Sequence, residues 1–165
     1  MLHCLHCWSQ AFSSSNGNRY LCESCDFTFY LNASWGVAVL LKDISGNYLR
    51  MIRGRDPYKG YLDTAGGFID PGESAEEAAR RECHEELGIE IHTLTYLGSF
   101  PGEYERCEIT RPIINLVFEA TLSLDQIARI SLSDEITGVE SYPLDLLPRD
   151  RLAKNIEGIQ TLLFP

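Results

Sequence analysis

The sequence has no long apolar run and no surplus of basic residues, and each absence excludes a class of protein. The longest apolar stretch, residues 36–41, is far shorter than the ~18 residues of a transmembrane helix. The first ten residues, MLHCLHCWSQ, lack the regions of a secretory signal, so we expect a cytoplasmic protein without a membrane partner. Lys and Arg number 14 against 24 Asp and Glu, and this balance argues against a nucleic-acid partner.

Cysteine, in contrast, is present six times, and four of these residues form two Cys-x-x-Cys pairs: Cys4, Cys7, Cys22 and Cys25. Without a secretory signal, such pairs indicate a metal site more than disulfides. Four thiolates complete a tetrahedral zinc site, which would stabilise a segment too small for a hydrophobic core. We therefore predict a structural Zn²⁺ in a ribbon over residues 1–32. The alternative is four reduced thiols in a loosely ordered tail.

The rest of the chain, residues 33–165, has the pattern of a second domain that mixes strands and helices. Gly and Pro in residues 64–72 indicate a loop. Strands are predicted at 34–41, 48–53, 89–100, 113–122 and 136–142, and helices at 73–87, 124–130 and 154–163. The first two strands form a hairpin around the turn at 45–47. This order predicts an α/β (α+β) class, with a mixed sheet covered by helices.

The helix at 73–87 concentrates negative charge on one face. Glu82, Glu85 and Glu86 are spaced i, i+3 and i+4, which brings their side chains together on a helix. Like charges at this spacing repel, and hard divalent cations such as Mg²⁺ or Mn²⁺ prefer oxygen ligands of this kind. The alternative interpretation is an acidic, solvated helix surface.

The surrounding segment, GFIDPGESAEEAARRECHEELGI (67–89), favours the metal site over the solvated surface. It resembles the Nudix hydrolase family strongly, because every fixed position of the Nudix box is filled. These positions are Gly67, Glu73, Arg81, Glu82, Cys83, Glu85, Glu86, Gly88 and Ile89. Cys83 is an unusual choice at an apolar position.

The resemblance implies a Nudix-type mixed sheet between helices and a catalytic site that needs Mg²⁺ or Mn²⁺. The metal ligands would be the Gly66 carbonyl and the carboxylates of Glu82, Glu85 and Glu86. Arg81 would hold a carboxylate in place. Glu73 would fix the glycine loop to the helix, or simply interact with the helix dipole. Gly67, Glu73 and Gly88 would be structural positions of the box.

Residues outside the box are candidates on weaker grounds. Many family members use a further glutamate from a later loop as ligand or base, and Glu135 is the candidate here, with Glu108 and Glu140 as weaker alternatives. Arg53 and Arg55 lie in a loop that could reach substrate phosphates, and Tyr104 could stack on a base. For these residues a solvated charge or a packing role is the competing interpretation.

A zinc ribbon before a Nudix domain resembles NADH pyrophosphatases and their relatives. Only Ser99, Pro101 and the aromatic residue at 104 agree with a motif that this group carries after the box. The resemblance implies a Nudix pyrophosphohydrolase that cleaves a nucleoside diphosphate linked to a group X into a nucleoside monophosphate and phosphorylated X. The candidates for the substrate are ADP-ribose, NADH and a sugar nucleotide. The resemblance also implies a possible homodimer. The alternative function is a catalytically silent nucleotide sensor with a partner-binding ribbon.

Overall fold

The computed structural model describes residues 2–14, 16–106, 109–153 and 159, and the chain divides into two compact units. The N-terminal unit comprises Met1–Ala33 and the C-terminal unit Ser34–Pro165. Among the described residues, no helix is long and apolar enough to cross a membrane.

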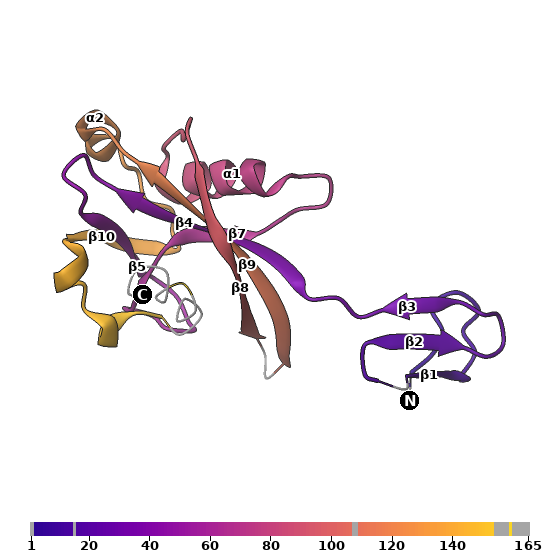
Figure 1. Cartoon of the computed structure of the whole chain (residues 1–165). Coiled ribbons are helices and arrows are strands. Elements are labelled where there is room, and N and C mark those ends of the chain that lie inside the picture. Colours follow the sequence, from indigo (N-terminus) through magenta and orange to yellow (C-terminus); the bar gives the residue numbers. More distant parts are fainter. Residues whose placement is uncertain (1, 15, 107–108, 154–158, 160–165) are drawn as a thin grey trace. The chain divides into compact units, whose positions relative to one another are not determined.

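The N-terminal unit is a small antiparallel sheet in the order β1-β2-β3 (Figure 1). Its strands are β1 (Phe12–Ser14), β2 (Arg19–Cys22) and β3 (Thr28–Tyr30). The rings of Phe12 and Phe29 both pack against Tyr20, with centroids 5.5 and 6.3 Å away. Cys4 and Cys22 are its fully buried cysteines.

The C-terminal unit is built on a seven-stranded sheet in the order β10-β5-β4-β9-β8, with β6 paired to β5 and β7 paired to β4 (Figure 1). The strands are β4 (Ser34–Lys42), β5 (Tyr48–Arg53), β6 (Leu62–Asp63), β7 (Ala65–Phe68), β8 (Thr95–Arg106), β9 (Ile109–Thr121) and β10 (Ile136–Tyr142). β4 and β9 run parallel and the other pairs antiparallel. The predicted mixed sheet of the α+β class is therefore confirmed.

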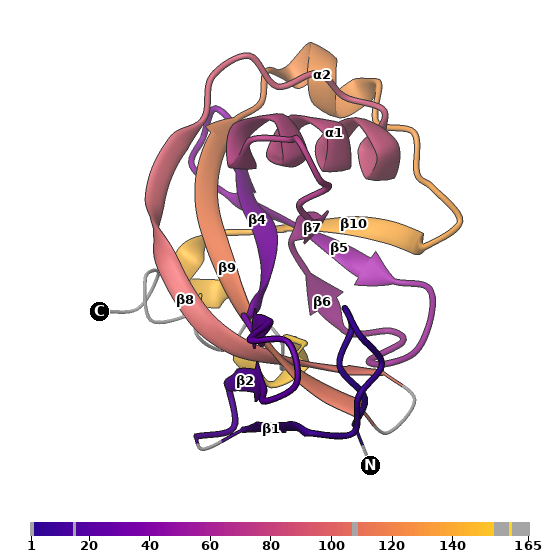
Figure 2. The ribbon, with the colours of Figure 1, turned by 90° about the vertical axis from the view of Figure 1, so that its right-hand side faces the viewer.

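Alternating residues of β4 supply the two sides of the core. Val37, Val39 and Leu41 pack in the cluster that α1 (Ala75–Leu87) covers, and Ala38 and Leu40 pack in a second cluster. Figure 2 shows α1 lying over one face of the sheet. The second cluster is closed by the segment that holds two short 3-10 helices, η1 (Leu144–Leu146) and η2 (Arg149–Arg151).

Capping interactions set both ends of α1, the helix that carries Glu82, Glu85 and Glu86. Ser74 and Glu77 form a reciprocal capping box, so the regular helix starts at Ala75, two residues later than predicted. Gly88 ends it in the left-handed conformation at φ 66°, which glycine adopts without steric cost. Ala78, Ala79, Cys83 and Leu87 form its buried side, so the glutamates lie on the remaining surface.

Four predicted elements differ from the structure. The strand predicted at 113–122 occupies Ile109–Thr121. The strand predicted at 89–100 occupies Thr95–Arg106, because the regular pairing with β9 begins at Thr95, while Ile89 and Ile91 are buried in an irregular segment. The predicted loop at 64–72 contains β7, which pairs with β4. The helix predicted at 124–130 is α2 (Leu124–Ala128). The helix predicted at 154–163 lies outside the described residues except for Ile159.

Candidate functional site

A cavity of about 490 Å³ in the C-terminal unit brings together residues that lie far apart in the sequence. Ten of the predicted site residues line it: Arg53, Arg55, Gly66, Gly67, Arg81, Glu82, Glu85, Glu86, Tyr104 and Glu135. Glu73 and Gly88 are not among the lining residues. The tertiary fold thus collects the box glutamates, the upstream arginines and the later glutamate around one space.

Arg81 connects several polar groups around α1. Its Nε and Nη2 donate to the two carboxylate oxygens of Glu73, at 2.9 and 3.0 Å. Its Nη1 donates to Glu82 Oε1 at 2.7 Å and to Glu85 Oε2 at 3.1 Å, and its Nη2 also donates to the Phe68 carbonyl at 2.9 Å. The guanidinium therefore orients three carboxylates at once, which a planar fork of five donors can do.

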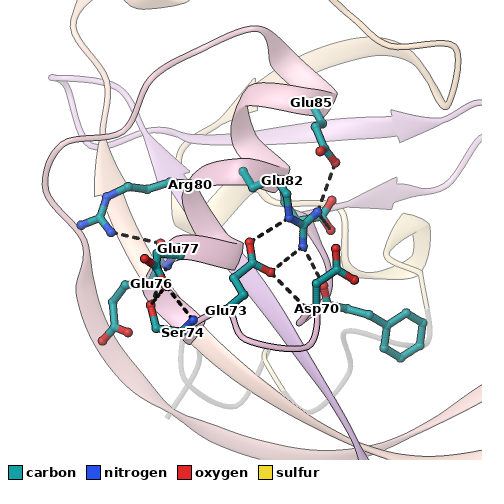
Figure 3. Close-up of polar contacts among 10 residues, drawn as sticks. Asp70, Glu73, Ser74, Glu76, Glu77, Arg80, Glu82 and Glu85 are labelled. Atoms are coloured by element: carbon teal, nitrogen blue, oxygen red, sulfur yellow. Dashed lines mark hydrogen bonds and ion pairs between the residues drawn. The ribbon is translucent and has the colours of Figure 1, made fainter.

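Glu73 joins the helix to the loop in front of it. Besides binding Arg81, its Oε2 accepts a hydrogen bond from the Asp70 backbone N–H at 3.1 Å. Figure 3 shows Glu73 beside Asp70 of the loop, with Glu82 and Glu85 farther along the helix. These contacts hold the pKa of Glu73 below its ordinary value, chiefly through the hydrogen bonds from Arg81.

Two glycines let the backbone pass close to the carboxylates. A Cβ at Gly67 would lie 2.3 Å from Glu82 Oε1, and a Cβ at Gly66 would lie 2.1 Å from the Val37 carbonyl oxygen. At Gly66 the neighbouring atom is backbone, so a side chain does not fit, and at Gly67 a side chain would require the Glu82 carboxylate to move. The Gly66 N–H donates to Glu86 Oε2 at 3.1 Å, so the strand β7 and the helix meet directly at this point.

Glu86 carries the largest electrostatic perturbation of the glutamates in the cavity. Burial raises its pKa to about 8, and the negative charges of Glu82, Asp63 and Glu135 add to this, while the Gly66 N–H opposes it. Burial also raises the pKa of Glu82. Carboxylate oxygens are the ligands that hard divalent metals prefer. A bound cation would favour the charged form of Glu82 and Glu86 and would offset the cost of ionising these buried groups.

Asp63 is a cavity residue that the sequence did not single out. It is 7% exposed and accepts a hydrogen bond from Arg53 Nη1 at 2.6 Å and from the Thr64 N–H at 2.8 Å. Asp63 lies near Glu86 because β6 pairs with β5, and the sequence pattern around Asp63 does not predict this pairing. Asp70, Asn115 and Ser133 also line the cavity and were missed for the same reason.

Glu135 reaches the cavity through backbone contacts of its loop. The Ser133 N–H donates to the Glu86 carbonyl at 3.0 Å, and the Gly54 N–H donates to the Glu135 carbonyl at 2.7 Å. The Glu135 carboxylate forms an ion pair with Arg55. The two weaker candidates differ: Glu140 is bound by Arg151 Nη1 at 3.0 Å and is absent from the cavity lining, and Glu108 lies outside the described residues.

The four paired cysteines form a separate cluster in the N-terminal unit. One sulfur from each of Cys4, Cys7, Cys22 and Cys25 lies within 4.8 Å of every other. Cys4 Sγ is 3.7 Å from Cys25 Sγ, and Cys7 Sγ is 3.6 Å from Cys22 Sγ. The His6 N–H donates to Cys4 Sγ at 3.4 Å, as expected for a turn that presents a thiolate. Four sulfurs so placed could hold a tetrahedral metal ion.

Comparison with known proteins agrees with this architecture. The NUDIX domain model matches residues 33–162. The NAD-capped RNA hydrolase NudC of Pseudomonas fluorescens is 31% identical over 127 residues, which cover 77% of this chain and 42% of that protein. The chain thus spans less than half the length of this curated relative.

Solved structures share the fold at low sequence identity. The MutT NUDIX hydrolase from Burkholderia pseudomallei has a TM-score of 0.65 and 24% identity, covering 80% of this chain and 96% of its own. The NUDIX domain of Shewanella oneidensis NrtR, solved with ADP ribose, has a TM-score of 0.61 and 18% identity, covering 79% of this chain and 84% of its own. Because the family model covers most of the chain, and because the three candidate metal-binding glutamates of the box line one cavity, this protein belongs to the NUDIX domain family.

Proposed function

We propose that this protein is a metal-dependent pyrophosphohydrolase. It cleaves the phosphoanhydride of a nucleoside diphosphate linked to a group X, and it releases a nucleoside monophosphate and phosphorylated X. The observation that carries this proposal is the Arg81 network, which orients Glu73, Glu82 and Glu85 at the edge of a cavity large enough for a nucleotide.

Glu82, Glu85 and Glu86 would hold Mg²⁺ or Mn²⁺, with the Gly66 carbonyl as a further ligand from the adjacent strand. A bound divalent metal neutralises phosphate charge and lowers the pKa of water. Arg53 and Arg55 line the same cavity and would contact the phosphates. Glu135 or one of the box glutamates accepts the proton of the attacking water.

The candidates for the whole substrate are ADP-ribose, a dinucleotide such as NADH, and a sugar nucleotide. The name of the Pseudomonas relative, NAD-capped RNA hydrolase, adds an NAD-linked 5′ end to these candidates. The structure of the NrtR domain with ADP ribose supports ADP-ribose as a ligand of this fold. An excess of acidic residues, 24 against 14 basic ones, favours a small substrate over a long RNA.

The decisive experiment measures hydrolysis of a panel with Mg²⁺ or Mn²⁺, with products separated by chromatography. The panel comprises ADP-ribose, NADH, ADP-glucose, a nucleoside triphosphate, a diadenosine polyphosphate and a short NAD-capped RNA. Wild type is compared with Glu86→Gln and with the control Glu76→Gln, an exposed position of the same helix outside the cavity. The proposal requires that one compound yields a nucleoside monophosphate and that only Glu86→Gln loses most of the activity.

The alternative function is a nucleotide sensor. This alternative would be favoured over the hydrolase if a compound binds without being cleaved.

We also propose that the cysteine cluster holds a structural Zn²⁺. Four converging sulfurs complete a closed site without an open position for substrate, so this metal would stabilise the N-terminal unit and take no part in hydrolysis.

A further inference from the structure

The cavity lining also contains side chains that differ in chemistry from the carboxylates. Phe68, Tyr104, Ile113 and Asn115 belong to it and are aromatic, aliphatic or amide groups. The Tyr104 and Phe68 rings meet edge to face, with centroids 5.0 Å apart and planes at 81°. An apolar and aromatic wall with one amide is suited to a planar, neutral and polar-edged group.

Strand register places these residues on one face of the sheet. Gly36 of β4 is the cross-strand partner of both Phe68 in β7 and Asn115 in β9. Ile113 lies two residues before Asn115, so both project from the same face of β9. Gly102 of β8 pairs with Ile113 and belongs to this face as well.

Glycine on both neighbouring strands leaves the Asn115 amide uncovered. A Cβ at Gly36 would lie 3.1 Å from Asn115 Oδ1, and a Cβ at Gly102 would lie 3.4 Å from Asn115 Nδ2. Larger side chains at either position would cover the amide. Among the described residues, the Asn115 side chain has no hydrogen-bond partner. The amide therefore presents a free donor and a free acceptor to the cavity.

We propose that Asn115 is the residue that selects the base of the substrate, and that the selected base is adenine. The 6-amino group of adenine donates to Oδ1, and the adjacent ring nitrogen N7 accepts from Nδ2, the bidentate pairing that asparagine makes with this base. The same edge of guanine has two acceptors, O6 and N7, and one of them would face Oδ1 without a hydrogen. Phe68 and Tyr104 supply the apolar contact for the ring. This inference rests on the proposed function, because it assumes that the diphosphate lies on the carboxylate side.

The test compares two pairs of ligands that differ only in the base. The kcat/KM is measured for ADP-glucose and GDP-glucose with Mn²⁺, and the Kd is measured by calorimetry for AMP and GMP. The variants are Asn115→Asp, Asn115→Leu and Asn32→Asp, the last of which adds the same charge at an exposed position outside the cavity.

Wild type and Asn32→Asp should favour adenine by about tenfold or more, within the range that one bidentate contact provides. Asn115→Asp should reverse the preference, because guanine can turn its N1–H and N2–H edge toward the carboxylate, whereas adenine keeps only its 6-amino donor and loses the hydrogen bond at N7. Asn115→Leu should bring the ratio close to one. If the adenine-to-guanine ratio is the same in Asn115→Asp as in wild type, the assignment is wrong.

The two parts of the experiment separate this inference from the proposed function. Absence of hydrolysis by wild type, together with an AMP preference that disappears in Asn115→Asp, would overturn the hydrolase and keep the base site. Hydrolysis that Glu86→Gln abolishes, together with a base ratio that is unchanged in Asn115→Asp, would keep the hydrolase and overturn the base site.

Discussion

Arg81 binds the carboxylate of Glu73 through two hydrogen bonds, from Nε to Oε1 at 2.9 Å and from Nη2 to Oε2 at 3.0 Å. The remaining Nη1 contacts Glu82 and Glu85, so one side chain links the start of the helix to the candidate metal ligands. The box arginine is thus a positioning residue, and its geometry leads to the first prediction.

Arg81→Lys should lower kcat/KM by about tenfold to a hundredfold, the usual effect of losing a group that orients metal ligands. A lysine ammonium keeps the charge but cannot bind Glu73 through two parallel bonds and Glu82 at the same time. Steady-state kinetics check this. The control is Arg80→Lys, whose guanidinium contacts the Ile91 and Glu76 carbonyls instead. Equal losses in both variants would contradict the positioning role.

Gly67→Ala should reduce activity and Mn²⁺ affinity with a small change in Tm. The added methyl would lie 2.3 Å from Glu82 Oε1, so the carboxylate must move away from the metal site. Mn²⁺ binding measured by electron paramagnetic resonance tests the displacement. In the control Gly138→Ala, the methyl meets the flexible end of Ile52 at 3.2 Å and lies away from the cavity. Unchanged Mn²⁺ affinity in Gly67→Ala would refute the prediction.

The stability of the protein without Mg²⁺ should fall as pH rises from about 5 to 8. Burial raises the pKa of Glu86 to about 8 from an ordinary value of 4.5. Between these values the folded protein keeps a proton that the unfolded chain has lost, so the free energy of unfolding decreases with pH. Added Mg²⁺ should oppose this loss, because the metal binds the deprotonated carboxylate.

Urea denaturation in chelating-resin-treated buffers measures this pH dependence. Glu86→Gln has no titrating group at this position and should show a shallower decline over the same interval. Parallel pH profiles for wild type and Glu86→Gln would show that Glu86 does not contribute the slope.

Glu135→Gln should lower kcat by about a hundredfold or more with a small change in KM if its carboxylate is the base, since general-base catalysis contributes that much. The matched control is Asp134→Asn, an exposed neighbour that does not line the cavity. A variant with near-normal kcat would assign the base to one of the box glutamates.

The purified chain should contain one zinc per molecule, measured by mass spectrometry, and Cys22→Ala should lose it. Cys22 Sγ lies 3.6 Å from Cys7 Sγ in the cluster. Cys83→Ala is the control, because Cys83 lies on the buried side of α1 and is outside the cysteine cluster found among the described residues. Retention of zinc by Cys22→Ala would exclude the four-cysteine site.

Local spacing by itself determined the features that depend on neighbours along the chain. Helical periodicity placed Glu82, Glu85 and Glu86 on one face, and Gly88 ended the helix at the predicted residue. The two Cys-x-x-Cys pairs identified the sulfur cluster. The alternation and turn at 45–47 predicted the hairpin of β4 and β5.

Only the tertiary structure decided which distant residues share the cavity. Asp63 is placed by the β5–β6 pairing and Asn115 by the parallel register of β4 and β9. Tyr104 meets Phe68 across two different strands. Strand register depends on pairing between segments far apart in the sequence, and a shift of one residue would turn Asn115 to the other face. Patterns within one segment of the sequence do not specify which distant strands pair. The box glutamates were therefore predictable from the sequence, whereas Asp63 and Asn115 were not.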